Sequence, residues 1–263
     1  DLYGEAGKAV RECETVVAVM GINKSIEREG QDRYGIELPA DQREFLREIY
    51  QVNPNIILVL VAGSSLAVNW ENEHLPAIVN AWYPGEQGGT AVAEVLFGDY
   101  NPAGRLPLTY YKSLEELPPF DDYDITKGRT YQYFKKDVLY PFGYGLSYTT
   151  FKYSNLEVTD AGKTVNVSFT LKNTGKRAGD EVVQVYVKLP EVAGGTQAIK
   201  QLKGFQRVAL KAGESRKVEI TVDKEQLRYW DEKQTCFVVP QGSFTFMVGA
   251  SSNDIRLENT TNL

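Results

Sequence analysis

The run Ile56-Ile-Leu-Val-Leu-Val-Ala-Gly63 decides the fold of the first half of this chain, because it is apolar throughout and ends in glycine. A continuous apolar run of this length is typical of a strand buried on both faces of a parallel sheet. A similar run, Thr15-Val-Val-Ala-Val-Met-Gly21, precedes it, and residues 77–83 form a third expected strand. Residues 105–109 are expected to form an edge strand, since Pro107 cannot donate to a central ladder.

Segments with helical spacing separate these strands. Helices are expected over residues 6–12 and 89–97. Another is expected to follow Leu38-Pro39-Ala40-Asp41, with Pro39 near its first turn, where proline is tolerated. Its apolar stripe has the spacing of one helix face: Phe45, Leu46, Ile49 and Tyr50. Alternation of strands and helices predicts an α/β layered domain with a mostly parallel sheet.

The hydrophobic period changes to two after about residue 150. Apolar residues then alternate with polar ones, as in half-buried strands. The apolar positions are Val165, Val167, Phe169 and Leu171; Val183, Val185 and Val187; Val218, Ile220 and Val222; and Phe244, Phe246 and Val248. About seven short strands separated by turns, without a helical stretch, predict an immunoglobulin-like or fibronectin-type β-sandwich.

These patterns predict a two-domain organisation of the α/β plus all-β class. Residues 1–110 are expected to form the α/β domain and residues 151–263 the β-sandwich. Residues 111–150 are expected to form a loop-rich linker, whose many aromatic side chains indicate that it packs on the domains.

Composition excludes several classes of protein. The 263 residues carry a net charge of −6 that is spread evenly, which disfavours a nucleic-acid binder. No apolar run approaches the ~18 residues of a membrane span. Cys13 and Cys236 are far apart, and His74 has no histidine or cysteine near it, so we expect unpaired thiols, no metal site and no cofactor.

The first candidate site is Ser25-Ile-Glu-Arg-Glu-Gly-Gln-Asp-Arg33, which directly follows a predicted strand. Ligands bind at the carboxyl ends of strands in open α/β sheets. Carboxylic acids are the groups that glycoside hydrolysis needs, as proton donor and as nucleophile or base. The alternative is a solvated loop in which Arg28 and Arg33 pair with the acidic residues around them.

A second candidate is Asn80-Ala-Trp-Tyr-Pro-Gly-Glu-Gln-Gly-Gly89, at the end of another predicted strand. A phosphate cradle is disfavoured, because no lysine follows at the spacing of a phosphate-binding loop and no G-x-G-x-x-G is present. A tight turn at the start of a helix is the better interpretation. Trp82 fits either a core position or a platform for a sugar ring.

These stretches together resemble glycoside hydrolase family 3 from about residue 5 to residue 255. The loop matches the family's E-x-E-G-x-D-R pattern, and Leu38-Pro39-Ala-Asp-Gln42 matches the L-P-x-x-Q that follows it. Further matches occur in the expected order: Ala81-Trp-Tyr-Pro-Gly-Glu-Gln-Gly-Gly89, Ala93-Glu-Val-Leu-Phe-Gly-Asp99, Asn101-Pro-Ala-Gly-Arg-Leu-Pro107, Gly128-Arg-Thr-Tyr131, Leu139-Tyr-Pro-Phe-Gly-Tyr-Gly-Leu-Ser-Tyr148, Asn173-Thr-Gly175, Gly179-Asp-Glu-Val-Val-Gln-Val-Tyr186 and Leu202-Lys-Gly-Phe205.

The resemblance implies a retaining exo-glycosidase built from a (β/α)8 barrel, an α/β domain and a fibronectin type III-like domain. It implies that Glu29 is the general acid/base, with Glu27 as the alternative. The nucleophile would be an aspartate on the barrel, to which nothing here is similar. We therefore expect a C-terminal fragment that is inactive by itself, because half of the active site is missing. Residues that bind the substrate's hydroxyl groups are not assigned.

An acidic residue, Glu27, lies two positions before Glu29. In this respect the sequence is more similar to the β-xylosidase and α-arabinofuranosidase members of the family than to the β-glucosidases. The expected substrate is therefore an oligosaccharide or glycoside with a terminal β-linked sugar, with β-xylosides favoured and xylan degradation as the setting. The family's usual work on plant glycans implies a periplasmic or extracellular location, with any signal peptide preceding this fragment. The alternative function is a non-catalytic module that binds carbohydrate or protein, with Trp82, Tyr83, Trp230 and the tyrosines of the linker as stacking surfaces or, more simply, as core.

Overall fold

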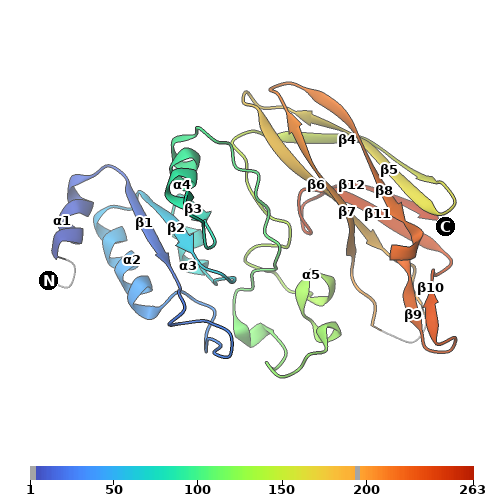
Figure 1. The fold of residues 1–263 in the computed structure, drawn as a ribbon, viewed down its shortest axis with the longest axis horizontal. Coiled ribbons are helices and arrows are strands. Elements are labelled where there is room, and N and C mark those ends of the chain that lie inside the picture. The colour runs from blue at the N-terminus through green and yellow to red at the C-terminus, as the bar shows by residue number, and fades with distance from the viewer. Residues whose placement is uncertain (1–3, 193–195) are drawn as a thin grey trace. The chain divides into compact units, whose positions relative to one another are not determined.

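A computed structural model describes residues 4–192 and 196–263 (Figure 1). The chain divides into two compact units. The first comprises the residues up to Tyr100 together with Tyr110–Glu116, and the second comprises Asn101–Thr109 and Leu117–Leu263. Each unit is described by itself.

The first unit contains the predicted parallel sheet. Its strands are β1 (Val16–Gly21), β2 (Ile56–Val61) and β3 (Ala77–Asn80), in the order β1-β2-β3. β1 and β2 pair in parallel from Val16↔Ile56 onward. All three strands were predicted from the apolar runs, although β3 ends three residues earlier than expected, at Asn80.

Four helices accompany this sheet in the described part of the first unit: α1 (Gly4–Glu12), α2 (Ala40–Val52), α3 (Asn69–His74) and α4 (Gly88–Phe97). The expected positions of α1, α2 and α4 are confirmed. Pro39 directly precedes α2, and the buried residues of that helix, Leu46 and Ile49, belong to the predicted stripe. The short helix α3 was not predicted, because six residues are too few to show a helical period.

The expectation that β1 is buried on both faces is wrong. Val17 and Val19 are 48% and 62% exposed, whereas Ala18 between them is buried. Successive side chains of a strand point to opposite faces. β1 is an edge strand covered on one face only within this unit, whereas the central strand β2 is buried along most of its length.

The expected edge strand over residues 105–109 is also wrong. Leu106 donates its N–H to Tyr144 O (2.8 Å) and accepts from Gly143 N (2.7 Å). Pro107 lacks an N–H, so this pairing does not extend into a ladder. Residues 101–109 belong to the second unit instead of the parallel sheet.

The second unit contains the predicted β-sandwich. One sheet has three antiparallel strands and the other has four. The first consists of β4 (Phe151–Asp160), β5 (Thr164–Asn173) and β8 (Ser215–Asp223), and the second of β12 (Ile255–Asn262), β11 (Ser243–Gly249), β6 (Gly179–Lys188) and β7 (Gln201–Leu210). The count of seven strands agrees with the sequence-based prediction.

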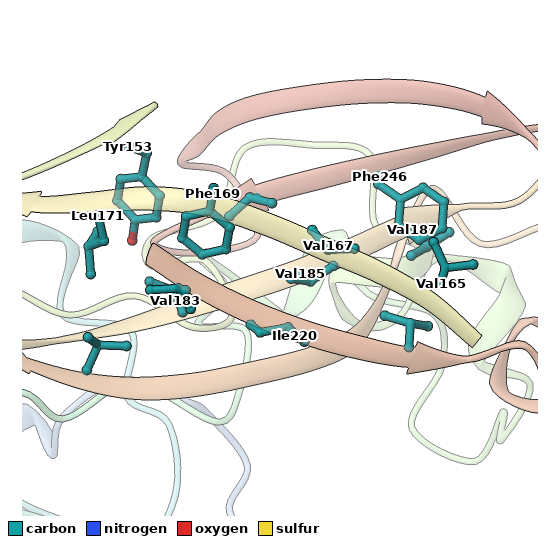
Figure 2. Packing of buried hydrophobic residues seen from close by; sticks show 14 of the residues in the cluster. Tyr153, Val165, Val167, Phe169, Leu171, Val183, Val185, Val187, Ile220 and Phe246 are labelled. Atoms are coloured by element: carbon teal, nitrogen blue, oxygen red, sulfur yellow. The ribbon is translucent and has the colours of Figure 1, made fainter. Parts of the chain in front are cut away.

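The core of this unit lies between the two sheets (Figure 2). Phe169 on β5 and Phe246 on β11 belong to opposite sheets, and both side chains are fully buried in this core. All thirteen apolar positions predicted from the period of two belong to this buried cluster. Burial of each aliphatic or aromatic side chain stabilises a fold by ~1.5–3 kcal/mol. Burial of this cluster therefore holds the two sheets together.

The remaining elements of the described chain are short. A hairpin of β9 (Tyr229–Asp231) and β10 (Cys236–Val238) extends from the second unit. The region expected to be a loop-rich linker contains three short helical elements: η1 (Leu114–Glu116), η2 (Ile125–Lys127) and α5 (Thr130–Tyr133). Another, η3 (Lys224–Leu227), follows β8. Asp124 explains η2, because its side chain accepts the Thr126 N–H at 3.0 Å and caps the helix.

Buried polar contacts attach the segment before β4 to the sandwich. Gln184 on β6 donates to Gly143 O (3.1 Å) and to Ala250 O (2.6 Å), and it accepts from the Tyr186 hydroxyl (2.5 Å). Gly143 has φ +82°, and a Cβ there would lie 2.0 Å from the Gln184 side-chain oxygen. Only glycine therefore permits this contact.

Candidate active-site loop

The candidate loop begins where β1 ends, at the carboxyl edge of the parallel sheet. Ile22 still donates its N–H to Val61 O of β2, at 3.1 Å. Asn23 then turns the chain: its backbone oxygen accepts the N–H groups of Ile26 and Glu27, each at 3.0 Å, and its side chain accepts the Ser25 N–H at 2.8 Å. Asparagine favours such turns because its side chain replaces a backbone acceptor.

Glu29 lies at the tip of a tight reverse turn. Arg28 and Gln31 exchange both backbone hydrogen bonds, at 3.1 and 2.9 Å, and Glu29 and Gly30 are the two residues between them. Gly30 has φ +74°, which glycine adopts without the penalty of a Cβ. The glycine of the E-G-x-D-R pattern therefore forms the turn that presents the glutamate.

Glu27 is held in place at the base of the same turn. Its carboxylate lies 2.5 Å from Arg33 Nε and accepts the Ser64 hydroxyl at 2.7 Å. Arg33 also donates to Ser64 Oγ and to Ser65 O, each at 3.0 Å. These hydrogen bonds connect the loop after β1 to the residues that follow β2. The Arg33 side chain at their centre is only 11% exposed.

The two candidate glutamates therefore differ in their surroundings. Glu27 is half-buried and paired, whereas Glu29 is exposed, and within residues 4–192 and 196–263 its carboxylate makes no hydrogen bond or ion pair. Of the alternative charged-loop pairings, the structure contains Arg33 with Glu27, while Arg28 and Asp32 form no ion pair within the described residues.

A cavity of about 550 Å3 lies beside the loop in the first unit. Gln31, Asp32 and Arg33 line it from the loop, and Arg43 lines it from α2. One guanidinium nitrogen of Arg33, Nη1, is buried and has no hydrogen-bond partner in the described chain. The loop thus combines an exposed carboxylate with a firmly held arginine.

Sequence reasoning missed Ser64. This residue follows the glycine that ends the second apolar run, and β2 is the parallel neighbour of β1. Carboxyl ends of adjacent parallel strands meet at one edge of the sheet, so a hydroxyl directly after β2 can reach the loop after β1. That positional signal was available in the sequence.

The second candidate stretch forms a turn followed by a helix. Gly88 donates its N–H to Gly85 O at 3.0 Å, and a Cβ on Gly88 would lie 2.5 Å from Pro84 Cβ. Close packing therefore explains this glycine. The Tyr83 hydroxyl donates to Ile22 O (3.1 Å) and its ring lies over Gly63, so Tyr83 supports the end of β1.

The histidine and the two cysteines of the chain lie outside the candidate loop. His74 is exposed, its Nδ1 lies 2.8 Å from Trp70 O, and its ring stacks on Trp70 at 4.6 Å. Cys13 and Cys236 are free and exposed. No group of three or more potential metal ligands occurs in the part of the chain that the structure describes, and no helix there is long and apolar enough to span a membrane.

Comparison with known proteins defines the class. Residues 2–148 match the model of the glycosyl hydrolase family 3 C-terminal domain, and residues 181–252 match that of the fibronectin type III-like domain. Because the first match covers more than half of the chain, the chain belongs to glycoside hydrolase family 3.

Individual relatives agree with this assignment. The chain is 42% identical to a xylan 1,4-beta-xylosidase of Xylanibacter ruminicola, over 94% of this chain and 31% of that protein. It is 35% identical to a periplasmic beta-glucosidase of Salmonella typhimurium, over 97% of this chain and 35% of that protein. A beta-glucosidase of Bifidobacterium adolescentis is similar in structure, with a TM-score of 0.94 and 34% identity over 100% of this chain and 41% of that one. The chain thus spans about a third of the length of the curated relatives it matches.

Proposed function

We propose that this chain is the C-terminal part of a retaining exo-glycosidase that hydrolyses terminal β-linked sugars and that Glu29 is its general acid/base. The observation that carries the proposal is the exposed Glu29 carboxylate at the tip of a tight turn, beside the carboxyl edge of the parallel sheet, where none of the described residues pairs with it. Such a carboxyl group is free to enter the active site of another domain.

In this mechanism Glu29 first donates a proton to the oxygen of the leaving group. After a glycosyl-enzyme intermediate has formed, the carboxylate of the same residue removes a proton from the attacking water. Glu27 fits this role less well, because its carboxylate already accepts from Ser64 and pairs with Arg33. We assign Glu27 and Arg33 to positioning the turn that carries Glu29.

A retaining enzyme needs a nucleophile about 5–5.5 Å from the acid/base. The family resemblance implies that an aspartate on a barrel domain has this role, outside the 263 residues. The relatives support this view, since the chain matches about a third of their length. We therefore expect no hydrolysis of aryl glycosides by the chain alone, beyond that of a Glu29→Gln control.

β-Xylosides are the favoured substrates. The acidic residue at position 27 supports this preference, as does the higher identity to a xylan 1,4-beta-xylosidase (42%) than to a periplasmic beta-glucosidase (35%). β-Glucosides are the second choice. The name of the periplasmic relative supports a periplasmic or extracellular location for the enzyme.

Azide rescue tests the role of Glu29 in the enzyme that contains this chain. Glu29→Ala is expected to lower turnover of substrates with poor leaving groups by about 10²–10⁴-fold. With an activated aryl glycoside, azide replaces the water that needs base catalysis, so added azide should restore turnover and yield a glycosyl azide of retained configuration. Glu27→Ala is the matched control, which azide should not rescue. Rescue of Glu27→Ala alone would transfer the role to Glu27.

A free-standing binding module is the second candidate, favoured by the half-exposed rings of Tyr83 and Trp230. The gene sequence upstream of Asp1 separates the two functions. A barrel-coding sequence there supports the glycosidase, whereas a start codon or signal peptide directly before Asp1 supports the module.

A further inference from the structure

The hairpin β9–β10 carries an exposed aromatic pair that the proposed catalysis does not use. Trp230 is 51% exposed and Phe237 is 59% exposed. The two residues are directly opposite each other in the hairpin, and their rings meet edge to face at 5.2 Å. The interpretation of Trp230 as core is therefore wrong. Because the two rings are in contact, they form one continuous exposed apolar surface, and contiguous exposed apolar surfaces can mark interaction sites.

A cavity of about 550 Å3 lies beside this hairpin in the second unit. Its volume is within the ~300–1,000 Å3 range of small-molecule sites. Three aromatic residues line it: Tyr133 from α5, and Tyr229 and Trp230 from β9. The flat surfaces of such rings match the apolar faces of pyranose rings.

Polar side chains that can make further hydrogen bonds line the same cavity. Gln197 uses its amide nitrogen to donate to Pro190 O (2.6 Å), which leaves its amide oxygen as an acceptor. Within the part of the chain that the structure describes, the side-chain amide of Gln201 and the carboxylate of Glu232 make no hydrogen bond. A side-chain amide can donate to or accept from the hydroxyl groups of a sugar, and a carboxylate can accept from them.

Hydrogen bonds and a cation–π contact order the hairpin that carries Trp230. Asp231 accepts the N–H groups of Lys233 and Gln234, at 2.8 and 3.0 Å, and so fixes the turn between the strands. The Arg228 guanidinium lies 5.8 Å from the centre of the Phe237 ring and pairs with Glu225 at 2.8 Å. A preorganised site loses less conformational entropy when it binds a ligand.

We propose that this cavity of the second unit is a glycan-binding site in which Trp230 stacks on a pyranose ring and Gln197 and Gln201 hydrogen-bond its hydroxyl groups. The ligand class is a neutral β-linked oligosaccharide. That choice rests on the proposed glycosidase function, while the site itself is independent of Glu29. Such a site would hold a polysaccharide near the enzyme without taking part in the reaction.

Nuclear magnetic resonance of the indole N–H groups tests the proposal on the chain itself. The chain has three tryptophans, of which Trp70 and Trp82 are in the first unit and Trp230 is in the second. Trp230→Phe identifies the Trp230 signal by its loss. We expect titration with xylohexaose or cellohexaose to shift that signal with a saturable, millimolar or tighter affinity, while the Trp70 signal stays in place.

Variants give the second measurement, for which affinity electrophoresis in gels containing soluble xylan is suitable. Trp230→Ala should weaken binding about tenfold or more, which corresponds to ~1.4 kcal/mol, and Trp230→Phe should weaken it less because a stacking ring remains. Phe205→Ala is the matched control, since Phe205 is 68% exposed and lies outside the cavity lining.

Three results would overturn the site. They are no shift of the Trp230 signal with either oligosaccharide, equal binding by Trp230→Ala, and self-association of the chain through Trp230 without glycan binding. Failure of azide rescue at Glu29 would overturn the proposed catalytic role and leave this result unaffected, so the two proposals fail separately.

Discussion

Replacement of Glu181 by glutamine should strongly destabilise the second unit. The Glu181 and Arg105 side chains are 6% and 8% exposed, and Arg105 Nη2 lies 2.7 Å from the carboxylate. The glutamine leaves the guanidinium buried without a counter-ion. Removing one partner of such a pair costs about 3–5 kcal/mol of the free energy of unfolding.

The neighbouring residue on β6 provides a matched control. Asp180 points to the opposite face of the strand and pairs with Arg207 at 2.6 Å, but these side chains are 28% and 55% exposed. Exposed pairs contribute ~0–1 kcal/mol, so Asp180→Asn should change stability little. Replacing both Arg105 and Glu181 by methionine should recover much of the loss, because no uncompensated charge remains.

Hydrogen exchange of the central amides of β5 and β6 is the suitable assay. It measures the opening free energy of the second unit whether or not the first unit unfolds in the same transition. Similar losses below about 1 kcal/mol for Glu181→Gln and Asp180→Asn would refute the reasoning that burial decides the contribution of the Arg105–Glu181 pair.

Three further outcomes follow from the contacts described. Gly30→Ala should cost about 1–2 kcal/mol of the stability of the turn, because φ is +74°. No atom lies within 4 Å of the new Cβ, so the cost comes from the backbone conformation alone. Gly30→Asn should cost less, and hydrogen exchange of the Gln31 amide measures the difference. Ser64→Ala leaves Glu27 and Arg33 each without one hydrogen bond and should lower the stability of the first unit by about 1–3 kcal/mol, measured by exchange of the β2 amides. Lys224, 2.8 Å away, holds the pKa of Asp160 below its ordinary value of 3.8. Wild type should therefore exceed Asp160→Asn in Tm above that pH and lose the advantage as the pH falls through the lowered pKa; an advantage that persists at lower pH would contradict this.

Most of the fold could be predicted because each unit buries its strands in a way that leaves a distinct hydrophobic pattern in the sequence. The apolar run that became β2 lies at the centre of a sheet, and the alternating positions of β5 and β6 face a single core. β1 was mispredicted in burial because an edge strand and a central strand can have the same composition. Residues 105–109 were mispredicted because pairing with Tyr144 depends on contacts distant in sequence.

The candidate site was predicted only in part. The charged residues and their place after β1 were visible, but spacing does not determine which carboxylate a loop leaves free. That distinction depends on Ser64 and on the backbone pairing of Arg28 with Gln31. Trp230 illustrates the same limit, since composition cannot separate a core ring from an exposed one.

The attachment of Asn101–Thr109 to the sandwich sets the boundary at which the second unit can be produced alone. Asn101 donates to Ala178 O (2.9 Å) and accepts from Ser147 Oγ (3.0 Å), and Gln184 donates to Gly143 O. An expression product cut at the change of period near residue 150 would lose all of these partners and leave the Gln184 amide short of an acceptor. A product that begins at Asn101 retains them, so we expect this longer product to fold cooperatively.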